Sequence, residues 1–206
     1  MNTKHNIGDL LSSRNPFKIP KHQRAYSWTE DEVEAFCNDI IYLTEVQNLQ
    51  EYFFGGIVSV HQLANNGPGR IYNVVDGQQR LTTFSLFLAL LRNAYKSMEN
   101  YAKNNNLTSY APMLAARANN IENSYLTYMD LQNNPPVKEY RLTLSSIDNL
   151  FFKNLLSGNQ HLNQTNPYLS ISHKKLDLAW ATIKNILIDP ILNDNNLTFD
   201  EKIQKF

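Results

Sequence analysis

The feature that most constrains the fold is a helix of unusual composition, which the sequence predicts from about Thr82 onwards. Nearly every residue from Phe84 to Leu91 is apolar, so no face of this helix suits water. A helix that is hydrophobic on all sides is buried in the middle of a domain. It follows closely on residues 71–75, a β-branched segment typical of a strand. The fold must therefore be built around a strand that leads into a central helix.

The sequence before this pair predicts an extended segment and an amphipathic helix. Pro20 restricts the residue before it to extended backbone, so residues 17–20 are expected to be extended. Thr29 and Glu32 have the spacing of a capping box, which predicts the start of a helix. Four apolar residues then recur at helical spacing and predict its buried stripe: Val33, Phe36, Ile40 and Leu43.

A second strand is predicted over residues 52–60, which are aromatic and β-branched around Gly55-Gly56. The cluster of Asn, Gly and Pro at 65–69 predicts a turn, so 52–60 and 71–75 are expected to form a hairpin. Paired glycines inside a strand indicate a bulge or a close approach of backbone.

From about residue 99 the sequence is rich in Asn and mostly helical in pattern. Four elements are expected there: a strand over 139–144, a helix from Ser145 to Gly158, a helix over 172–188 that stops at Asp189-Pro190, and a helix capped by Thr198 and Glu201. The predicted class is therefore α+β. A small sheet with flanking helices forms a core over 10–98, and a mostly helical part of the same module covers 99–206.

Charge and composition limit the classes of function. The chain has 206 residues, of which 42% are hydrophobic and 18% charged, as expected of a globular domain. Nineteen basic residues balance nineteen acidic ones, so no overall positive field attracts nucleic acid, and any phosphate binding must be local. No apolar run approaches the ~20 residues of a membrane helix, and the polar N-terminus has no signal core. We expect a cytoplasmic protein with no membrane partner.

The single cysteine and the five histidines do not indicate a redox or metal site. Cys37 has the apolar helical neighbours Val33 and Ile41, and we expect it to be a small buried residue. The histidines lack the spacing of zinc ligands. No metal site is assigned.

Residues 76–80 come where the strand leads into the central helix, a position suited to anion binding. Free backbone amides and the positive end of the helix dipole point there. Gly77 lets the backbone approach a ligand, and Arg80 supplies a planar donor fork that matches phosphate oxygens. Gln78 and Gln79 are suited to positioning a water, or to holding a sugar or a base edge.

The neighbouring polar residues have two interpretations each. Thr82 and Thr83 cap the helix, contact phosphate, or do both. Asp76 either holds Mg²⁺ together with nucleotide phosphates or caps the turn through backbone amides. The junction as a whole could also be an ordinary tight turn, with Arg80 paired to a nearby carboxylate, because strand-turn-helix junctions with Gly are common.

Two motifs about fifty residues apart distinguish a site from a turn. Residues 19–28 are Ile-Pro-Lys-His-Gln-Arg-Ala-Tyr-Ser-Trp, and residues 75–83 are Val-Asp-Gly-Gln-Gln-Arg-Leu-Thr-Thr. Together they resemble the paired signature of the domain-of-unknown-function family that opens GmrSD-type restriction proteins. Residues 52–58 resemble its intervening strand, and 141–144 with Asp148 resemble its later strand-helix element.

The resemblance implies a fold shared with ParB N-terminal domains and sulfiredoxin, in which a Gly-x-x-Arg loop grips nucleotide phosphate. Gln78 lies where sulfiredoxin has a reactive cysteine, so thiol chemistry does not carry over.

The resemblance also brings Gln23 and Arg24 to the nucleotide site, with Tyr26 and Trp28 as aromatic companions. The alternative for both aromatics is a place in the core, which we favour for Trp28 because large aromatic side chains usually serve packing. His22 replaces a tyrosine common in the family, so a stacking role there does not carry over.

The implied function is binding and hydrolysis of a nucleoside triphosphate, GTP or ATP, with Mg²⁺ as an option, in a DNA restriction and phage-defence protein. The residues implied as catalytic are Asp76, Gln78, Gln79 and Arg80. The residues implied in nucleotide binding are Gln23, Arg24, Tyr26, Gly77, Arg80, Thr82 and Thr83. The alternative is a non-catalytic regulatory module that binds nucleotide or DNA, and a third option is an interaction domain.

The resemblance also implies partners. Full-length members usually continue into an HNH-like nuclease domain, and no histidine motif of that kind occurs here. We therefore expect a truncated chain that does not cut DNA alone, with a C-terminal nuclease domain or subunit and DNA as partners of the full protein. A homodimer is left open.

Overall fold

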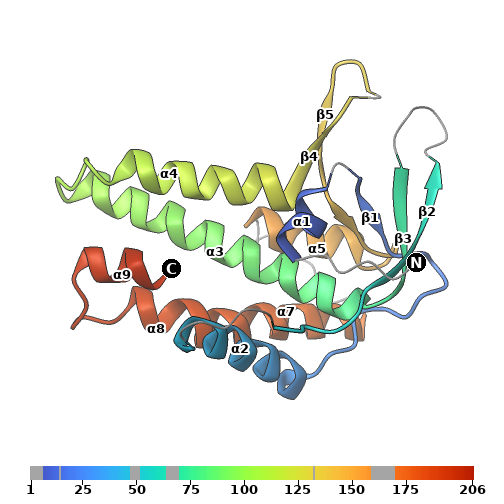
Figure 1. The fold of residues 1–206 in the computed structure, drawn as a ribbon, viewed down its shortest axis with the longest axis horizontal. Helices are drawn as coiled ribbons and strands as arrows, with labels where there is room; N and C mark the ends of the chain where they lie inside the picture. Colours follow the sequence, from blue (N-terminus) through green and yellow to red (C-terminus); the bar gives the residue numbers. More distant parts are fainter. Residues whose placement is uncertain (1–6, 14, 47–51, 64–69, 132, 159–169) are drawn as a thin grey trace.

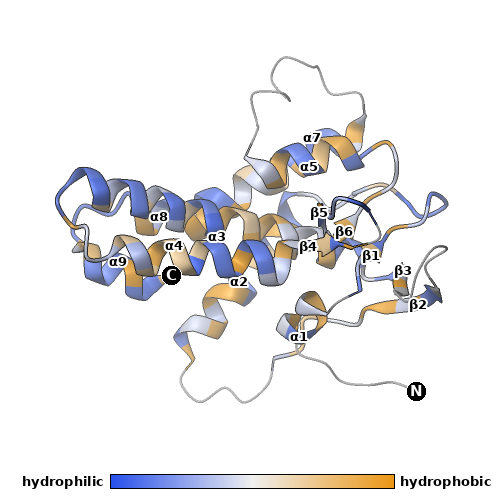
Figure 2. Ribbon diagram, turned by 90° about the horizontal axis from the view of Figure 1, so that it is seen from above, coloured by the Kyte–Doolittle hydropathy of each residue, from blue (hydrophilic) through white to orange (hydrophobic). Residues whose placement is uncertain are grey.

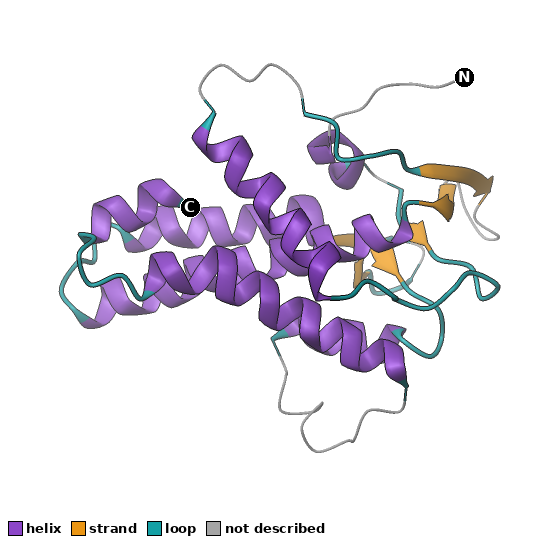
Figure 3. Cartoon of the chain, turned by 90° about the horizontal axis from the view of Figure 1, so that it is seen from below, coloured by secondary structure: helices purple, strands orange, loops and turns teal. Residues whose placement is uncertain are grey.

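The computed structural model describes residues 7–13, 15–46, 52–63, 70–131, 133–158 and 170–206. Strands gather at one end of the molecule and helices extend from the other (Figure 3). The class is α+β, as predicted. The helices are α1 (Ile7–Ser12), α2 (Glu30–Glu45), α3 (Gln78–Asn104), α4 (Ala111–Asn120), η1 (Ile121–Leu126), α5 (Asn149–Ser157), α7 (Ile171–Ile183), η2 (Lys184–Ile188), α8 (Asp189–Leu192) and α9 (Phe199–Lys205). The strands are β1 (Phe17–Lys18), β2 (Val58–Leu63), β3 (Arg70–Asp76), β4 (Thr127–Asp130), β5 (Val137–Tyr140) and β6 (Leu142–Thr143).

The larger sheet has the strand order β2-β3-β1-β6. The short strand β1 runs parallel to both β3 and β6, while β2 pairs antiparallel with β3. The predicted hairpin is therefore confirmed, but its first strand begins at Val58 rather than Tyr52. The predicted turn at 65–69 lies outside the described residues.

The helix α3 occupies the middle of the molecule, as its apolar sequence predicts. The helix α4 lies along one side of it and α2 and α7 along the other (Figure 1). Leu81, Leu86 and Ala89 of α3 are fully buried, and one hydrophobic cluster joins them to Phe17 of β1 and Leu176 of α7. The surrounding helices carry alternating hydrophilic and hydrophobic patches, as expected where one face packs on a core (Figure 2).

Local start and stop signals are largely confirmed. Glu32 accepts a hydrogen bond from the backbone N–H of Thr29 at 2.5 Å, which completes the capping box of α2. Gly158 ends α5 in the left-handed conformation. Thr198 begins α9 with a second capping box. Cys37 is fully buried, and burial raises the pKa of its thiol to about 12.

Two predicted elements differ from the structure. The strand predicted over 139–144 is split at Arg141 into β5 and β6, which belong to different sheets. Arg141 separates them because its backbone bonds to Leu126 on one side and Phe17 on the other. The helix predicted over 172–188 consists of α7 and η2, and it does not stop at Asp189-Pro190 but is followed directly by α8. Pro190 is tolerated because it falls in the first turn of α8, where its missing N–H would have no helical partner.

None of the helices in the described ranges is long and apolar enough to cross a membrane.

Candidate functional site

A cavity of about 410 Å³ opens where β3 ends and α3 begins. Its lining residues are Gln23, Arg24, Trp28 and the run Val75, Asp76, Gly77, Gln78, Gln79 and Arg80. These come from the two sequence motifs, which lie far apart in the chain. Gln23 Nε2 joins them directly, because it donates a hydrogen bond to the Val75 carbonyl at 3.2 Å. The structure therefore brings both motifs to one cavity.

The junction between β3 and α3 is a single residue, Gly77. It has a φ of +83° and forms the N-cap of α3, so Gln78 to Arg80 are the first turn of the helix rather than a loop. A Cβ atom on Gly77 would lie 2.8 Å from the Gly56 carbonyl oxygen. The backbone that approaches Gly77 closely is thus that of Gly56 in the same chain. The first helical turn lines the cavity, and its N–H groups have no partner within the helix, which suits an anion.

Arg80 is half-buried against the segment that precedes β2. Its Nη1 donates to the Gly56 carbonyl at 3.3 Å, and a Cβ atom on Gly55 would lie 2.6 Å from Arg80 Cζ. The close backbone approach expected at the paired glycines is therefore an approach to Arg80. Within the described ranges neither Arg80 nor Arg24 forms an ion pair with a carboxylate. The described residues therefore do not support the alternative in which a nearby carboxylate neutralises Arg80.

Asp76 is exposed on the cavity wall. Its side chain makes no hydrogen bond to any described residue, so the predicted capping of the turn is not seen. Mg²⁺ at this carboxylate would need most of its ligands from phosphate oxygens and water, since the described residues contain no group of three or more His, Cys, Asp or Glu that could hold a metal.

The two glutamines of the first turn have opposite surroundings. Gln79 Oε1 accepts from the Ser27 backbone N–H at 2.9 Å, and its Nε2 donates to the Ala25 carbonyl at 3.2 Å. Gln79 thus clamps the Arg24 segment onto α3 and is a positioning residue. Gln78 is 7% exposed, and its Oε1 is buried without a hydrogen-bond partner.

Tyr26, Thr82 and Thr83, all predicted to bind nucleotide, do not line the main cavity. The Tyr26 hydroxyl shares a hydrogen bond of 2.9 Å with Thr83 Oγ1, and burial raises the pKa of Tyr26. Thr82 and Thr83 donate to the Gln78 and Gln79 carbonyls at 2.8 and 2.9 Å. The threonines neither cap α3 nor face the main cavity, because their hydroxyls bond back to the preceding turn. Trp28 borders the cavity and also packs against the core.

A second, inner cavity of about 10 Å³ shares Arg24, Gln78 and Gln79 with the main one, and no sequence pattern indicated it. Asp148, 1% exposed, contributes to its wall. Asp148 Oδ1 accepts from Ser172 Oγ at 2.5 Å, and Oδ2 accepts from the Tyr26 N–H at 3.4 Å. The sequence identified Asp148 only as part of a helix start, because its partners are distant along the chain. The only available signal was its place in the family's later element.

Lys175 of α7 was also missed. Its Nζ donates to the Ser27 carbonyl at 2.6 Å. The segment that carries Arg24 is therefore held from three directions: by Gln79 of α3, by Asp148 and by Lys175. This anchoring fixes the path of the backbone on either side of Tyr26.

The fold and the cavity define an α+β domain with two cationic side chains at the N-terminus of its central helix. The family described as the N-terminal domain of GmrSD restriction endonucleases matches residues 7–205, and the chain belongs to this family. No curated protein matches the chain. The match covers the helices after residue 98 as well as both motifs, and it assigns the chain to a restriction system of the kind that acts in phage defence.

Proposed function

We propose that this domain binds a nucleoside triphosphate, ATP or GTP, with its phosphates at the N-terminus of α3. The observation that supports the proposal is the pair Arg24 and Arg80, which border one cavity and have no carboxylate partner among the described residues. Cations that the protein leaves unpaired beside free helix amides suit phosphate oxygens. The cavity volume also lies in the range typical of small-ligand sites.

The same residues suggest how hydrolysis would proceed. Arg24 and Arg80 would neutralise phosphate charge, and Asp76 would hold Mg²⁺ or orient the attacking water. The water oxygen would form a bond to the terminal phosphorus while the bond from that phosphorus to the bridging oxygen breaks. The bridging oxygen would keep the electron pair on the departing nucleoside diphosphate. One proton of the water would stay on the attacking oxygen, and the other would pass to another oxygen of the released phosphate.

A non-catalytic regulatory module that binds nucleotide or DNA backbone is the second candidate. It is favoured by the hydrogen bonds of Gln79, whose amide is engaged by Ala25 and Ser27. Gln79, predicted to be catalytic, would therefore hold the Arg24 segment in place and would not act on a water. Turnover of nucleotide by the purified chain, with and without DNA, separates the two candidates.

The family supplies the context for either candidate. In a GmrSD restriction protein, nucleotide bound here would control or drive a nuclease part that acts on DNA. A ParB- or sulfiredoxin-like arrangement of the sheet around the phosphate site belongs to the same proposal. Such a module would act in the cytoplasm, where both nucleotide and incoming DNA are found.

The binding step is tested by thermal melting with Mg-ATP, Mg-GTP and duplex DNA. A ligand that binds only the folded state stabilises it by RT ln(1 + L/Kd), where L is the free ligand concentration, and so raises the melting temperature. We expect nucleotide to stabilise the parent and the control Lys103→Ala, which removes an exposed cation from the same helix. We expect no stabilisation of the double variant Arg24→Ala/Arg80→Ala. Equal stabilisation of all three proteins would contradict the proposal.

A further inference from the structure

The side-chain carbonyl of Gln78 is a buried acceptor without a donor. Its Oε1 is inaccessible and makes no hydrogen bond to any described residue. Buried polar atoms are nearly always paired, because losing water without gaining a partner is costly. The adjacent Gln79, in the same helical turn, has both ends of its amide bonded. The unpaired Gln78 Oε1 therefore indicates a donor that is not among the described residues.

The inner cavity that Gln78 borders favours a small neutral donor. Its volume of about 10 Å³ admits roughly one water-sized group. The Asp148 carboxylate in its wall repels anions, and Ser172 and Tyr26 already donate to this carboxylate. Arg24 also borders the inner cavity but makes no hydrogen bond to Gln78. Phosphate is excluded from this place and belongs in the main cavity with Arg80, whereas a hydroxyl fits.

The position of Gln78 limits which group of a nucleotide can donate to its Oε1. The inner cavity shares Arg24, Gln78 and Gln79 with the main cavity that would hold the phosphates, so the donor must lie next to the phosphates. In a nucleoside triphosphate the donors nearest to the phosphates are the sugar hydroxyls, and the amino groups of the base lie further away. We propose that the inner cavity receives a sugar hydroxyl of the bound nucleotide, which donates to Gln78 Oε1. This inference rests on the proposed nucleotide binding and adds selectivity for the sugar.

The test compares the affinities of ATP, 2′-deoxy-ATP and 3′-deoxy-ATP, by calorimetric titration with Mg²⁺. We expect the parent to bind one deoxy analogue at least about tenfold more weakly than ATP, because its site then keeps an unpaired buried acceptor. Gln78→Met removes that acceptor and should bind all three nucleotides with equal affinity. Gln62→Met is the matched control, since Gln62 of β2 is exposed and borders neither cavity, and it should still discriminate.

Each other result has a defined meaning. If the parent binds ATP and both analogues equally, or if Gln78→Met still discriminates, the sugar inference is wrong while nucleotide binding stands. If removal of a base amino group, as in inosine triphosphate against GTP, is the only change that weakens binding, the donor is on the base and the inference is also wrong. If the parent binds neither ATP nor GTP, the proposed function fails as well. Gln78→Asn, which withdraws the carbonyl without adding apolar bulk, replaces Gln78→Met if the latter does not fold.

Discussion

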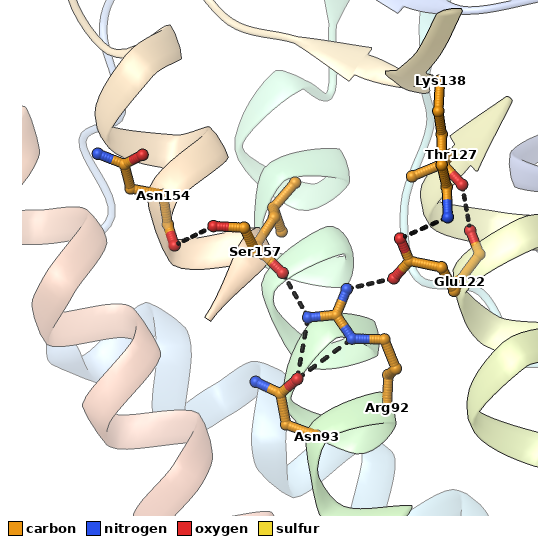
Figure 4. Close-up of polar contacts among 8 residues, drawn as sticks. Arg92, Asn93, Glu122, Thr127, Lys138, Asn154 and Ser157 are labelled. Atoms are coloured by element: carbon orange, nitrogen blue, oxygen red, sulfur yellow. Dashed lines mark hydrogen bonds and ion pairs between the residues drawn. The ribbon is translucent and has the colours of Figure 1, made fainter. Parts of the chain in front are cut away.

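Arg92 and Arg80 lie on the same helix, yet the rest of the chain surrounds them differently. Arg92 is 2% exposed, forms an ion pair with Glu122, and donates to Asn93 Oδ1 and to the Leu156 carbonyl (Figure 4). Arg80 has one long hydrogen bond to a backbone carbonyl and no ion pair within the described ranges. A guanidinium that the fold satisfies holds elements together, whereas one that it leaves unsatisfied is available to a ligand.

The surroundings of Arg92 explain why it is structural. Glu122, in η1, accepts from Arg92 and also pairs with Lys138 of β5 at 3.0 Å. Its backbone carbonyl accepts from Thr127 Oγ1 at 2.7 Å. This network joins α3 to η1 and to the β4-β5 hairpin, so its loss should affect the fold as a whole. Loss of Arg80 should affect only the cavity.

The largest expected effect is that of Arg92→Ala on stability. The variant leaves Glu122 with only the exposed Lys138 as a partner and removes the donor to the Leu156 carbonyl. Losing one partner of a buried ion pair typically costs ~3–5 kcal/mol. We expect a loss of that size in the free energy of unfolding, measured by urea denaturation. Lys103→Ala, which breaks an exposed pair on the same helix, should cost only ~0–1 kcal/mol. A loss below about 1 kcal/mol for Arg92→Ala would remove the contrast with Arg80.

Arg80→Ala should weaken nucleotide binding and leave stability almost unchanged. We expect ~2–4 kcal/mol of lost nucleotide binding, because a charge-assisted contact to phosphate is strong and its loss leaves the ligand charge uncompensated. Stability should change little. Arg80→Lys keeps the charge but loses the planar fork, so it should recover part of the affinity. Thermal melting and nucleotide titration of the parent and both variants test this prediction. If Arg80→Ala unfolds, or if it binds nucleotide as tightly as the parent, Arg80 is a structural residue.

Gly55→Ala sharpens the comparison without touching Arg80 itself. Gly55 has a φ of +98°, and the added methyl group would meet the Arg80 guanidinium. We expect displacement of Arg80, a loss of ~1–3 kcal/mol in nucleotide affinity, and a cost in stability of about 1 kcal/mol from backbone strain. Gly56→Ala is the matched control, because nothing lies within 4 Å of a Cβ atom there. If both variants bind nucleotide alike, the position of Arg80 against Gly55 is unimportant for binding.

The smallest effect concerns pH and the Arg92 network. Burial by itself would raise the pKa of Glu122, but the hydrogen bonds and charges of Lys138 and Arg92 outweigh burial and hold this pKa below its ordinary 4.5. A carboxyl group with a lowered pKa in the folded state contributes stability above its unfolded pKa, and this contribution is lost as the pH falls through the folded value. The stability difference between the parent and Glu122→Gln should therefore shrink below about pH 4.5. A difference that stays constant through acid denaturation would show that folding does not shift the pKa of Glu122.

The sequence predicted those features that depend on neighbours along the chain. The apolar run after Thr82 predicted a central helix, and Thr29 and Thr198 marked helix starts correctly. The two motifs predicted one composite cavity only because their resemblance to a family linked them. Features set by distant partners could not be predicted: Gln79 bonding the Ala25–Ser27 backbone, and Asp148 meeting Ser172. Side-chain type alone suggested that both glutamines were equivalent, and the fold distinguishes them.

The length of α3 has a mechanical consequence. Its 27 residues span about 40 Å at 1.5 Å per residue. Its first turn borders the cavity, and near its other end Tyr101 stacks on Phe199 of α9, with ring centroids 5.6 Å apart. Continuous hydrogen bonds make the helix a stiff rod, and the single-residue junction at Gly77 joins it to the sheet without slack. A displacement of the first turn of α3 at the cavity would therefore also move the C-terminal end of the helix, where it contacts α9.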